Sequence, residues 1–195
     1  QAQAVAECTY LETLRGLEGS ASERYFSHLD DLILTNKDEF RYSERNRRPP
    51  LDPVNALLSF LYALLSNLCA GALQQAGLDP YVGFLHRDRP GRISLALDLM
   101  EEFRGLFCDR LALTLINTRV LTAKDFDRKE NGAVFLSDTG KKAVINAWQT
   151  KKQEQIEHPY LSEKIPWGLA PHIQALLLAR FLRGDLDTYP PFLWK

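Results

Sequence analysis

Three acidic side chains crowd into one short segment of the sequence, between Ser94 and Arg104. Asp98 precedes Glu101 by three residues and Glu102 by four, and both spacings place carboxylates on one face of a helix. Like charges at this spacing destabilise a helix unless a cation lies between them. Carboxylates with one imidazole suit Mn²⁺, and oxygen ligands with water suit Mg²⁺. The segment is a candidate metal site, although acidic residues early in a helix are also common as solvated partners of its dipole.

Two further residues could complete such a site. His86 follows the apolar run Gly83-Phe84-Leu85, and Glu18 lies between two glycines, which permit close approach of the backbone. Each has a plainer explanation, because a single loop histidine is often structural and glycines often mark a turn. The sequence contains no P-loop, GxGxxG, GxSxG or HExxH motif.

Arginines form local clusters. Four arginines and one glutamate between Arg41 and Arg48 give a net charge of +3, and Arg87, Arg89 and Arg92 surround His86. Guanidinium groups near a metal site would neutralise a polyanionic backbone, whereas isolated arginine-rich loops are usually solvated surface.

The 195 residues carry a net charge of -1 and are 45% hydrophobic and 25% charged, which excludes a disordered or collagen-like chain. Any nucleic-acid role must therefore rest on local patches. Cys8, Cys69 and Cys108 stand far apart without a CxxC pair, which argues against a zinc site or a disulfide framework and favours a reducing, cytoplasmic compartment. Because residue 1 is Gln and Met100 is the only methionine, we expect that an upstream segment is missing.

The hydrophobic periodicity is helical almost throughout and predicts an all-α, compact multi-helix domain over residues 1–195, with at most one short strand. A capping box at Ser20 and Glu23 predicts a new helix after a break at 16–20, although the glycines there could equally mark a kink in one long helix. The only strand candidate is 133–136. The expected helices are 4–16, 20–34, 53–76, 94–120, 137–156 and 167–183.

The helix expected over 53–76 has clear end signals, with Asp52 as N-cap, Pro53 in the first turn and Gly77 after the end. It is apolar enough to suggest a membrane span. However, Asn55, Ser59, Tyr62 and Ser66 form one polar stripe at helical period, which favours a buried helix that lines a site.

Four motifs follow one another along the chain: Leu14-Arg15-Gly16-Leu17-Glu18-Gly19, Arg47-Arg48-Pro49-Pro50 with Asp52-Pro53-Val54-Asn55, Gly83-Phe84-Leu85-His86, and the segment from Ser94 to Arg104. In this order they resemble the catalytic helical domain of the CRISPR-associated spacer integrases, the Cas1 family. The match is fullest with the branch found with type I-C systems and with Cas4 fusions. That family has an N-terminal β-rich dimerisation domain, which nothing in this chain matches. The ending, from Leu178-Ala179-Arg180 to Tyr189-Pro190-Pro191, is also similar.

The resemblance implies that Glu18, His86 and Glu101 bind Mg²⁺ or Mn²⁺, that Asp98 orients a ligand or a metal-bound water, and that Glu102 faces away. We expect Asn55 and Tyr62 to support the site. The predicted DNA-contacting residues are Arg41, Arg45, Arg47, Arg48, Arg92, Arg104, Arg180 and Arg183.

The implied reaction joins the 3′-hydroxyl ends of prespacer DNA to a CRISPR repeat by transesterification. It needs no protein nucleophile, in keeping with the lack of a Ser/His or Cys/His motif. The implied partners are the prespacer duplex, the CRISPR repeat, a second copy in the complete protein, Cas2 and a fused or separate Cas4 module, with no membrane. A metal-dependent DNA endonuclease and a non-catalytic helical scaffold for DNA or protein are the alternatives.

Overall fold

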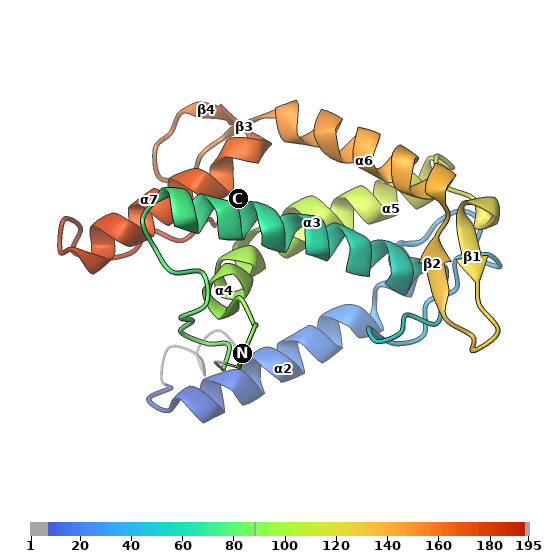
Figure 1. The fold of residues 1–195 in the computed structure, drawn as a ribbon, viewed down its shortest axis with the longest axis horizontal. Helices are drawn as coiled ribbons and strands as arrows, with labels where there is room; N and C mark the ends of the chain where they lie inside the picture. Colours follow the sequence, from blue (N-terminus) through green and yellow to red (C-terminus); the bar gives the residue numbers. More distant parts are fainter. Residues whose placement is uncertain (1–7, 88, 194–195) are drawn as a thin grey trace.

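The computed structural model describes residues 8–87 and 89–193 and is mostly helical, which confirms the all-α prediction (Figure 1). The expected helix over 4–16 begins outside these residues. The main elements are α2 (Leu11–Ser27), α3 (Pro53–Gln75), α4 (Ser94–Phe103), the π-helical segment η2 (Arg104–Asp109), α5 (Arg110–Asn117), α6 (Asp138–Gln153) and α7 (Ala170–Leu182). Short 3-10 turns are η1 (Asp30–Leu32), η3 (Ala123–Asp125) and η4 (Trp167–Leu169).

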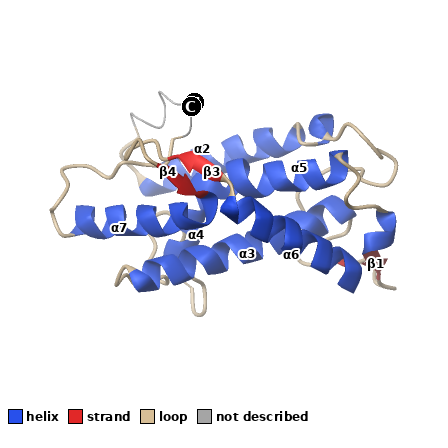
Figure 2. Ribbon diagram, turned by 90° about the horizontal axis from the view of Figure 1, so that it is seen from above, coloured by secondary structure: helices blue, strands red, loops and turns tan. Residues whose placement is uncertain are grey.

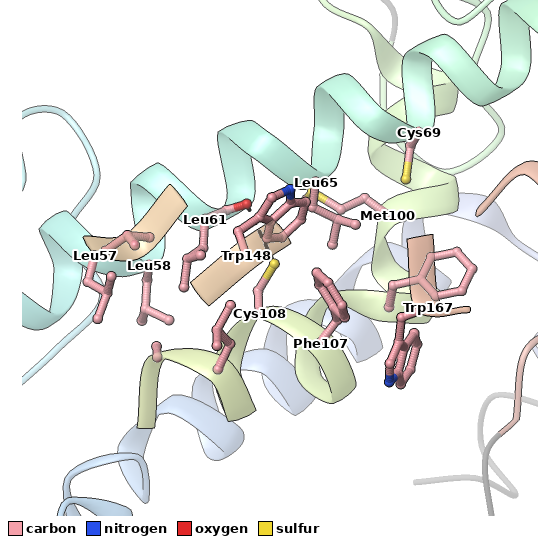
Figure 3. Close-up of a cluster of buried hydrophobic side chains, with 14 of the residues drawn as sticks. Leu57, Leu58, Leu61, Leu65, Cys69, Met100, Phe107, Cys108, Trp148 and Trp167 are labelled. Atoms are coloured by element: carbon pink, nitrogen blue, oxygen red, sulfur yellow. Dashed lines mark hydrogen bonds between the residues drawn. The ribbon is translucent and has the colours of Figure 1, made fainter. Parts of the chain in front are cut away.

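Helix α3 forms the centre of the core and packs against α4, α5, α7 and η2. Its start and end are as predicted: the Asp52 side chain accepts a hydrogen bond from the Asn55 backbone N–H at 2.8 Å, and Gly77 adopts φ +78°. Its buried leucines and Cys69 meet Met100, Phe107, Cys108, Trp148 and Trp167 (Figure 3). Helix α3 is long and apolar enough to cross a membrane. However, its leucines and Cys69 are buried inside the fold, so it is the core helix.

Helix α2 is continuous, so the predicted break is wrong and the alternative of one long helix is confirmed. The Ser20 hydroxyl donates to the carbonyl of Gly16 at 3.1 Å, one turn earlier, instead of capping a new helix. Both nearby glycines face open space, where a Cβ would meet nothing within 4 Å. Glu18 therefore lies in the middle of a helix, which ends at Ser27 rather than continuing to 34.

The segment predicted as one helix from Ser94 is α4, η2 and α5 in succession, and it ends at Asn117. The π-helical stretch was not predicted. Such segments are rare and often occur at functional sites, because the wider turn changes the direction of the side chains.

Within the described part of the chain, four short strands form two small antiparallel pairs (Figure 1 and Figure 2). β1 (Phe126–Arg128) pairs with β2 (Val134–Leu136), which confirms the predicted strand at 133–136. β3 (Gln155–Glu157) pairs with β4 (Lys164–Pro166). The last residues of the helix predicted to 156 thus lie in β3. Strands of three residues are too short to show an alternating pattern, and for this reason β1, β3 and β4 were not predicted from the sequence.

Candidate functional site

A cavity of about 730 Å³ lies between α2, α3, α4 and the loops that contain Arg47 and His86. In Figure 1, α4 lies between α2 and α3. Glu18 from α2, His86 from the loop before α4 and Glu101 from α4 all line this cavity. The fold therefore brings the three predicted metal ligands together from three separate segments.

Asp98 fixes the position of His86. Its Oδ1 accepts a hydrogen bond from the His86 backbone N–H at 2.9 Å and lies 2.7 Å from the ring Nδ1. Its Oδ2 accepts from the backbone N–H groups of Phe84 at 2.6 Å and Leu85 at 3.1 Å. Burial alone would raise the pKa of Asp98, but these bonds to the ionised carboxylate lower it overall. With the Nδ1 proton assigned to this contact, Nε2 of His86 is left to bind a ligand.

Gly83 allows the His86 loop to approach α4 closely. A Cβ at this position would lie 2.7 Å from Cβ of Ser94 and 2.9 Å from Oδ2 of Asp98, both closer than real Cβ contacts. Glycine is therefore required where the loop wraps the carboxylate.

Glu101 is a partly buried carboxylate with charges of both signs near it. Burial raises its pKa, the Arg104 guanidinium opposes that rise, and the charge of Glu18 adds to it. Arg104 donates to Oε1 of Glu101 at 2.9 Å. Glu18 and Glu101 thus repel each other across the cavity, which a bound cation would relieve.

The donor set fits a divalent ion: two carboxylates and an imidazole whose other nitrogen meets a carboxylate are typical of such sites. Among residues 8–87 and 89–193, however, no three His, Cys, Asp or Glu side chains stand at metal-binding distances already. Glu101 turns to Arg104 instead, so the three residues share the cavity without forming a preassembled cluster.

Five of the predicted DNA-contacting arginines line the same cavity, namely Arg45, Arg47, Arg48, Arg92 and Arg104. Arg45 is the most firmly held: its Nη1 donates to Asn55 Oδ1 at 2.5 Å, its Nη2 donates to Ser59 Oγ at 3.2 Å, and its guanidinium lies 5.4 Å from the centre of the Tyr62 ring. Burial lowers its pKa. Ser59, Tyr62 and Ser66 of the polar stripe on α3 line the cavity, as the period of the stripe predicted, whereas Asn55 is fully buried and contacts the site through Arg45.

The other three predicted arginines lie elsewhere. Arg41 is exposed and does not line the cavity, and Arg180 and Arg183 lie at the end of α7, where Arg183 pairs with Asp185 at 2.9 Å. Residue type alone could not separate them from the five in the cavity.

Glu102 faces away from the cavity, as the resemblance implied. Its carboxylate accepts hydrogen bonds from the Tyr189 hydroxyl at 2.6 Å, the Gln174 amide at 2.8 Å and the Phe192 backbone N–H at 2.8 Å. It therefore ties the C-terminal segment to α4.

Sequence reasoning missed the residues that link α2 to the His86 loop. Arg15 donates through Nε to the Leu85 carbonyl at 2.7 Å, and Arg87 pairs with Glu12 at 2.6 Å. Arg15 precedes Glu18 by three residues and so shares its helix face, a spacing that could have revealed it.

Residues 1–150 match the family model described as CRISPR associated protein Cas1. A CRISPR-associated endonuclease Cas1 of Rhodospirillum rubrum is 58% identical over 182 residues, which covers 93% of this chain and 53% of the relative. A Cas4/Cas1 fusion of Geobacter sulfurreducens is 41% identical and covers 95% of this chain and 34% of the relative. The chain spans about half the length of the curated relatives it matches first.

Solved structures also resemble the fold. A casposase bound to integration product has a TM-score of 0.88 at 26% identity and covers 98% of this chain and 54% of that one. A Cas6-RT-Cas1–Cas2 complex has a TM-score of 0.84 at 26% identity and covers 98% of this chain and 20% of that one.

Proposed function

This chain belongs to the CRISPR-associated Cas1 family, and we propose that it carries the site of a metal-dependent DNA integrase. In this proposal, the enzyme joins the 3′-hydroxyl ends of prespacer DNA to a CRISPR repeat. The observation that supports it most is that Glu18, His86 and Glu101 line one cavity together with five arginines. Acidic and imidazole ligands suit a divalent ion, and the arginines suit a phosphate backbone.

Glu18, Glu101 and Nε2 of His86 would hold Mg²⁺ or Mn²⁺, and Asp98 would orient the imidazole through its Nδ1. A divalent ion held by these residues would favour the alkoxide form of the 3′-hydroxyl and would polarise the phosphate that this oxygen attacks. Arg104, which pairs with Glu101, would balance charge that develops on the phosphate.

The reaction is a direct exchange of ester bonds. The 3′-hydroxyl oxygen of the prespacer bonds to phosphorus while the P–O bond of the repeat strand breaks, and the leaving 3′-oxygen takes up a proton. No side chain becomes covalently attached, so the residues that line the cavity need only bind, orient and neutralise.

We infer that the complete protein acts in the cytoplasm as a homodimer with Cas2 and a Cas4 module. The Cas1–Cas2 complex and the Cas4/Cas1 fusion among the similar proteins support both partners. The three cysteines are free, in keeping with a reducing compartment.

Alanine substitution of each ligand tests the proposal. In the full-length protein, Glu18→Ala, His86→Ala and Glu101→Ala should each abolish Mn²⁺-dependent strand joining while the far-ultraviolet circular dichroism stays unchanged. Glu130→Ala, an exposed residue in the β1–β2 turn, is the matched control. If any of these three alanine variants kept full joining activity, the substituted residue would not be a metal ligand.

A DNA endonuclease is the second candidate, because the similar curated proteins are named endonucleases. The same site could activate water instead of a 3′-hydroxyl. The products distinguish the two: joined, branched DNA supports the integrase, and shortened ends support the endonuclease. Absence of both products and of Mn²⁺ binding would favour a non-catalytic scaffold.

A further inference from the structure

One buried carboxylate connects three helical segments beneath the cavity. Asp109 ends the π-helical segment η2 and is only 1% exposed. Its Oδ1 accepts a hydrogen bond from the Tyr62 hydroxyl on α3 at 2.5 Å, and its Oδ2 accepts from the Tyr25 hydroxyl on α2 at 2.9 Å. Through these two hydrogen bonds the carboxyl group of Asp109 forms a joint between α2, α3 and η2.

The joint matters most for α2, because this helix has little apolar packing to hold it. Phe26 is its only buried residue among those the structure describes. Polar contacts hold it instead: Arg15 bonds to the Leu85 carbonyl on one side of Glu18, and Tyr25 bonds to Asp109 on the other. Tyr25 follows Glu18 by seven residues, about two turns, so both lie on the same side of the helix.

The hydrogen bond between Asp109 and Tyr62 connects the joint to Arg104. The Tyr62 ring lines the cavity, and the Arg104 guanidinium lies 5.8 Å from its centre while donating to Glu101. A cation over an aromatic face is attracted to it, so the place of the ring helps to fix the place of the guanidinium. By fixing the Tyr62 hydroxyl, Asp109 limits where Arg104 and its partner Glu101 can lie.

We propose that Asp109 is a positioning residue of the reaction, which holds Glu18 in place through Tyr25 and Arg104 in place through Tyr62. Asp109 is buried and does not line the cavity, so its hydrogen bonds reach the site through these two tyrosines. The inference rests on the proposed function, because it takes Glu18 and Glu101 as ligands. A carboxylate at this depth is costly unless both oxygens are satisfied, as they are here.

Tyr25→Phe in the full-length protein tests the inference, because it removes only the hydroxyl that joins α2 to Asp109. We expect amide hydrogen exchange in α2 to become about tenfold faster while exchange in α3 and α7 stays unchanged. The Mn²⁺ concentration for half-maximal strand joining should rise about tenfold. Asp109→Asn, which keeps the shape of the side chain, should produce both effects at least as strongly.

Tyr42→Phe is the matched control. Tyr42 is 5% exposed, and its buried hydroxyl has no hydrogen-bond partner within the part of the chain that the structure describes. This variant also loses a buried tyrosine hydroxyl, but it should match the wild type in both measurements.

The outcomes separate the inference from the function on which it rests. Unchanged α2 exchange in Tyr25→Phe, or faster α2 exchange with an unchanged Mn²⁺ requirement, would overturn the positioning role alone. A wild-type protein without any Mn²⁺-dependent joining would overturn the proposed function and this inference with it. Faster exchange in α2 together with a raised Mn²⁺ requirement, in Tyr25→Phe but not in Tyr42→Phe, supports the inference.

Discussion

Asp98 holds both the backbone and the imidazole ring of His86 through a single oxygen: Oδ1 accepts from the backbone N–H at 2.9 Å and lies 2.7 Å from Nδ1. Asp98 also lies three residues before Glu101 on α4. One turn of α4 therefore positions two of the proposed metal ligands: it contains Glu101, and its Asp98 holds His86. Their relative geometry depends on Asp98 although Asp98 itself is not a proposed ligand.

Asp98→Asn should raise the Mn²⁺ concentration for half-maximal joining about 10- to 100-fold, the usual cost of losing a residue that orients a metal ligand. An amide has one acceptor oxygen where the carboxylate uses two, so the loop and the ring cannot both stay bound. Asp79→Asn is the control, because Asp79 is exposed, does not line the cavity and accepts a hydrogen bond from the nearby Tyr81 backbone N–H at 2.9 Å. Equal Mn²⁺ requirements in the two variants would contradict the orienting role.

Gly83→Ala should lower the free energy of unfolding by about 1–3 kcal/mol and reduce strand joining, because its Cβ would collide with Ser94 and Asp98. Gly71→Ala in α3 has nothing within 4 Å of the added Cβ, and it should raise the free energy of unfolding by about 0.5–1 kcal/mol. Urea denaturation of both variants measures the two changes. If Gly83→Ala is as stable and active as the wild type, the close approach of the His86 loop to α4 is not required.

The stability of the protein should fall as the pH decreases from about 7 to about 5, and His158 is one cause. His158 is 0% exposed, and its Nδ1 accepts from the Tyr160 and Leu161 backbone N–H groups at 3.3 Å each. Burial lowers its pKa below the ordinary 6.5. As the pH falls, His158 therefore takes up a proton more readily in the unfolded chain than in the folded chain. Stability is kept above the ordinary pKa and lost as the pH falls through it, by at most about 1.4 kcal/mol per pH unit.

Denaturation of His158→Gln across this pH range checks the assignment, since its loss of stability should be shallower. His28→Gln is the control because His28 has an exposed ring, with 70% of the side chain accessible. If the free energy of unfolding falls equally with decreasing pH in the wild type, His158→Gln and His28→Gln, His158 does not cause the pH dependence.

DNA affinity should fall steeply with added salt, because the cavity arginines displace counterions from phosphates. Arg47→Ala should lower the slope of log affinity against log salt by about 1. Arg183→Ala serves as the comparison, since Arg183 is paired with Asp185 and does not line the cavity. Fluorescence anisotropy at several salt concentrations measures both slopes. An unchanged slope in Arg47→Ala would contradict the contact, and a lower slope in Arg183→Ala would extend the interface to the end of α7.

The sequence predicted α3 almost to the residue, because Asp52, Pro53 and Gly77 give local signals that the structure uses directly. It misread α2, because glycines at 16 and 19 are common at breaks but also occur inside helices. It missed the role of Asp109, whose partners lie 84 and 47 residues away and depend on tertiary packing. The same dependence explains why eight arginines were predicted to contact DNA although only five line the cavity.

The proposed metal site is tested most directly by locating Mn²⁺ in crystals of the full-length protein from its anomalous scattering. We expect a peak within bonding distance of the Glu18 and Glu101 carboxylates and Nε2 of His86, and we expect Glu101→Ala to lose it. A peak bound by other residues, or no peak at an Mn²⁺ concentration that supports strand joining, would contradict the proposed metal site.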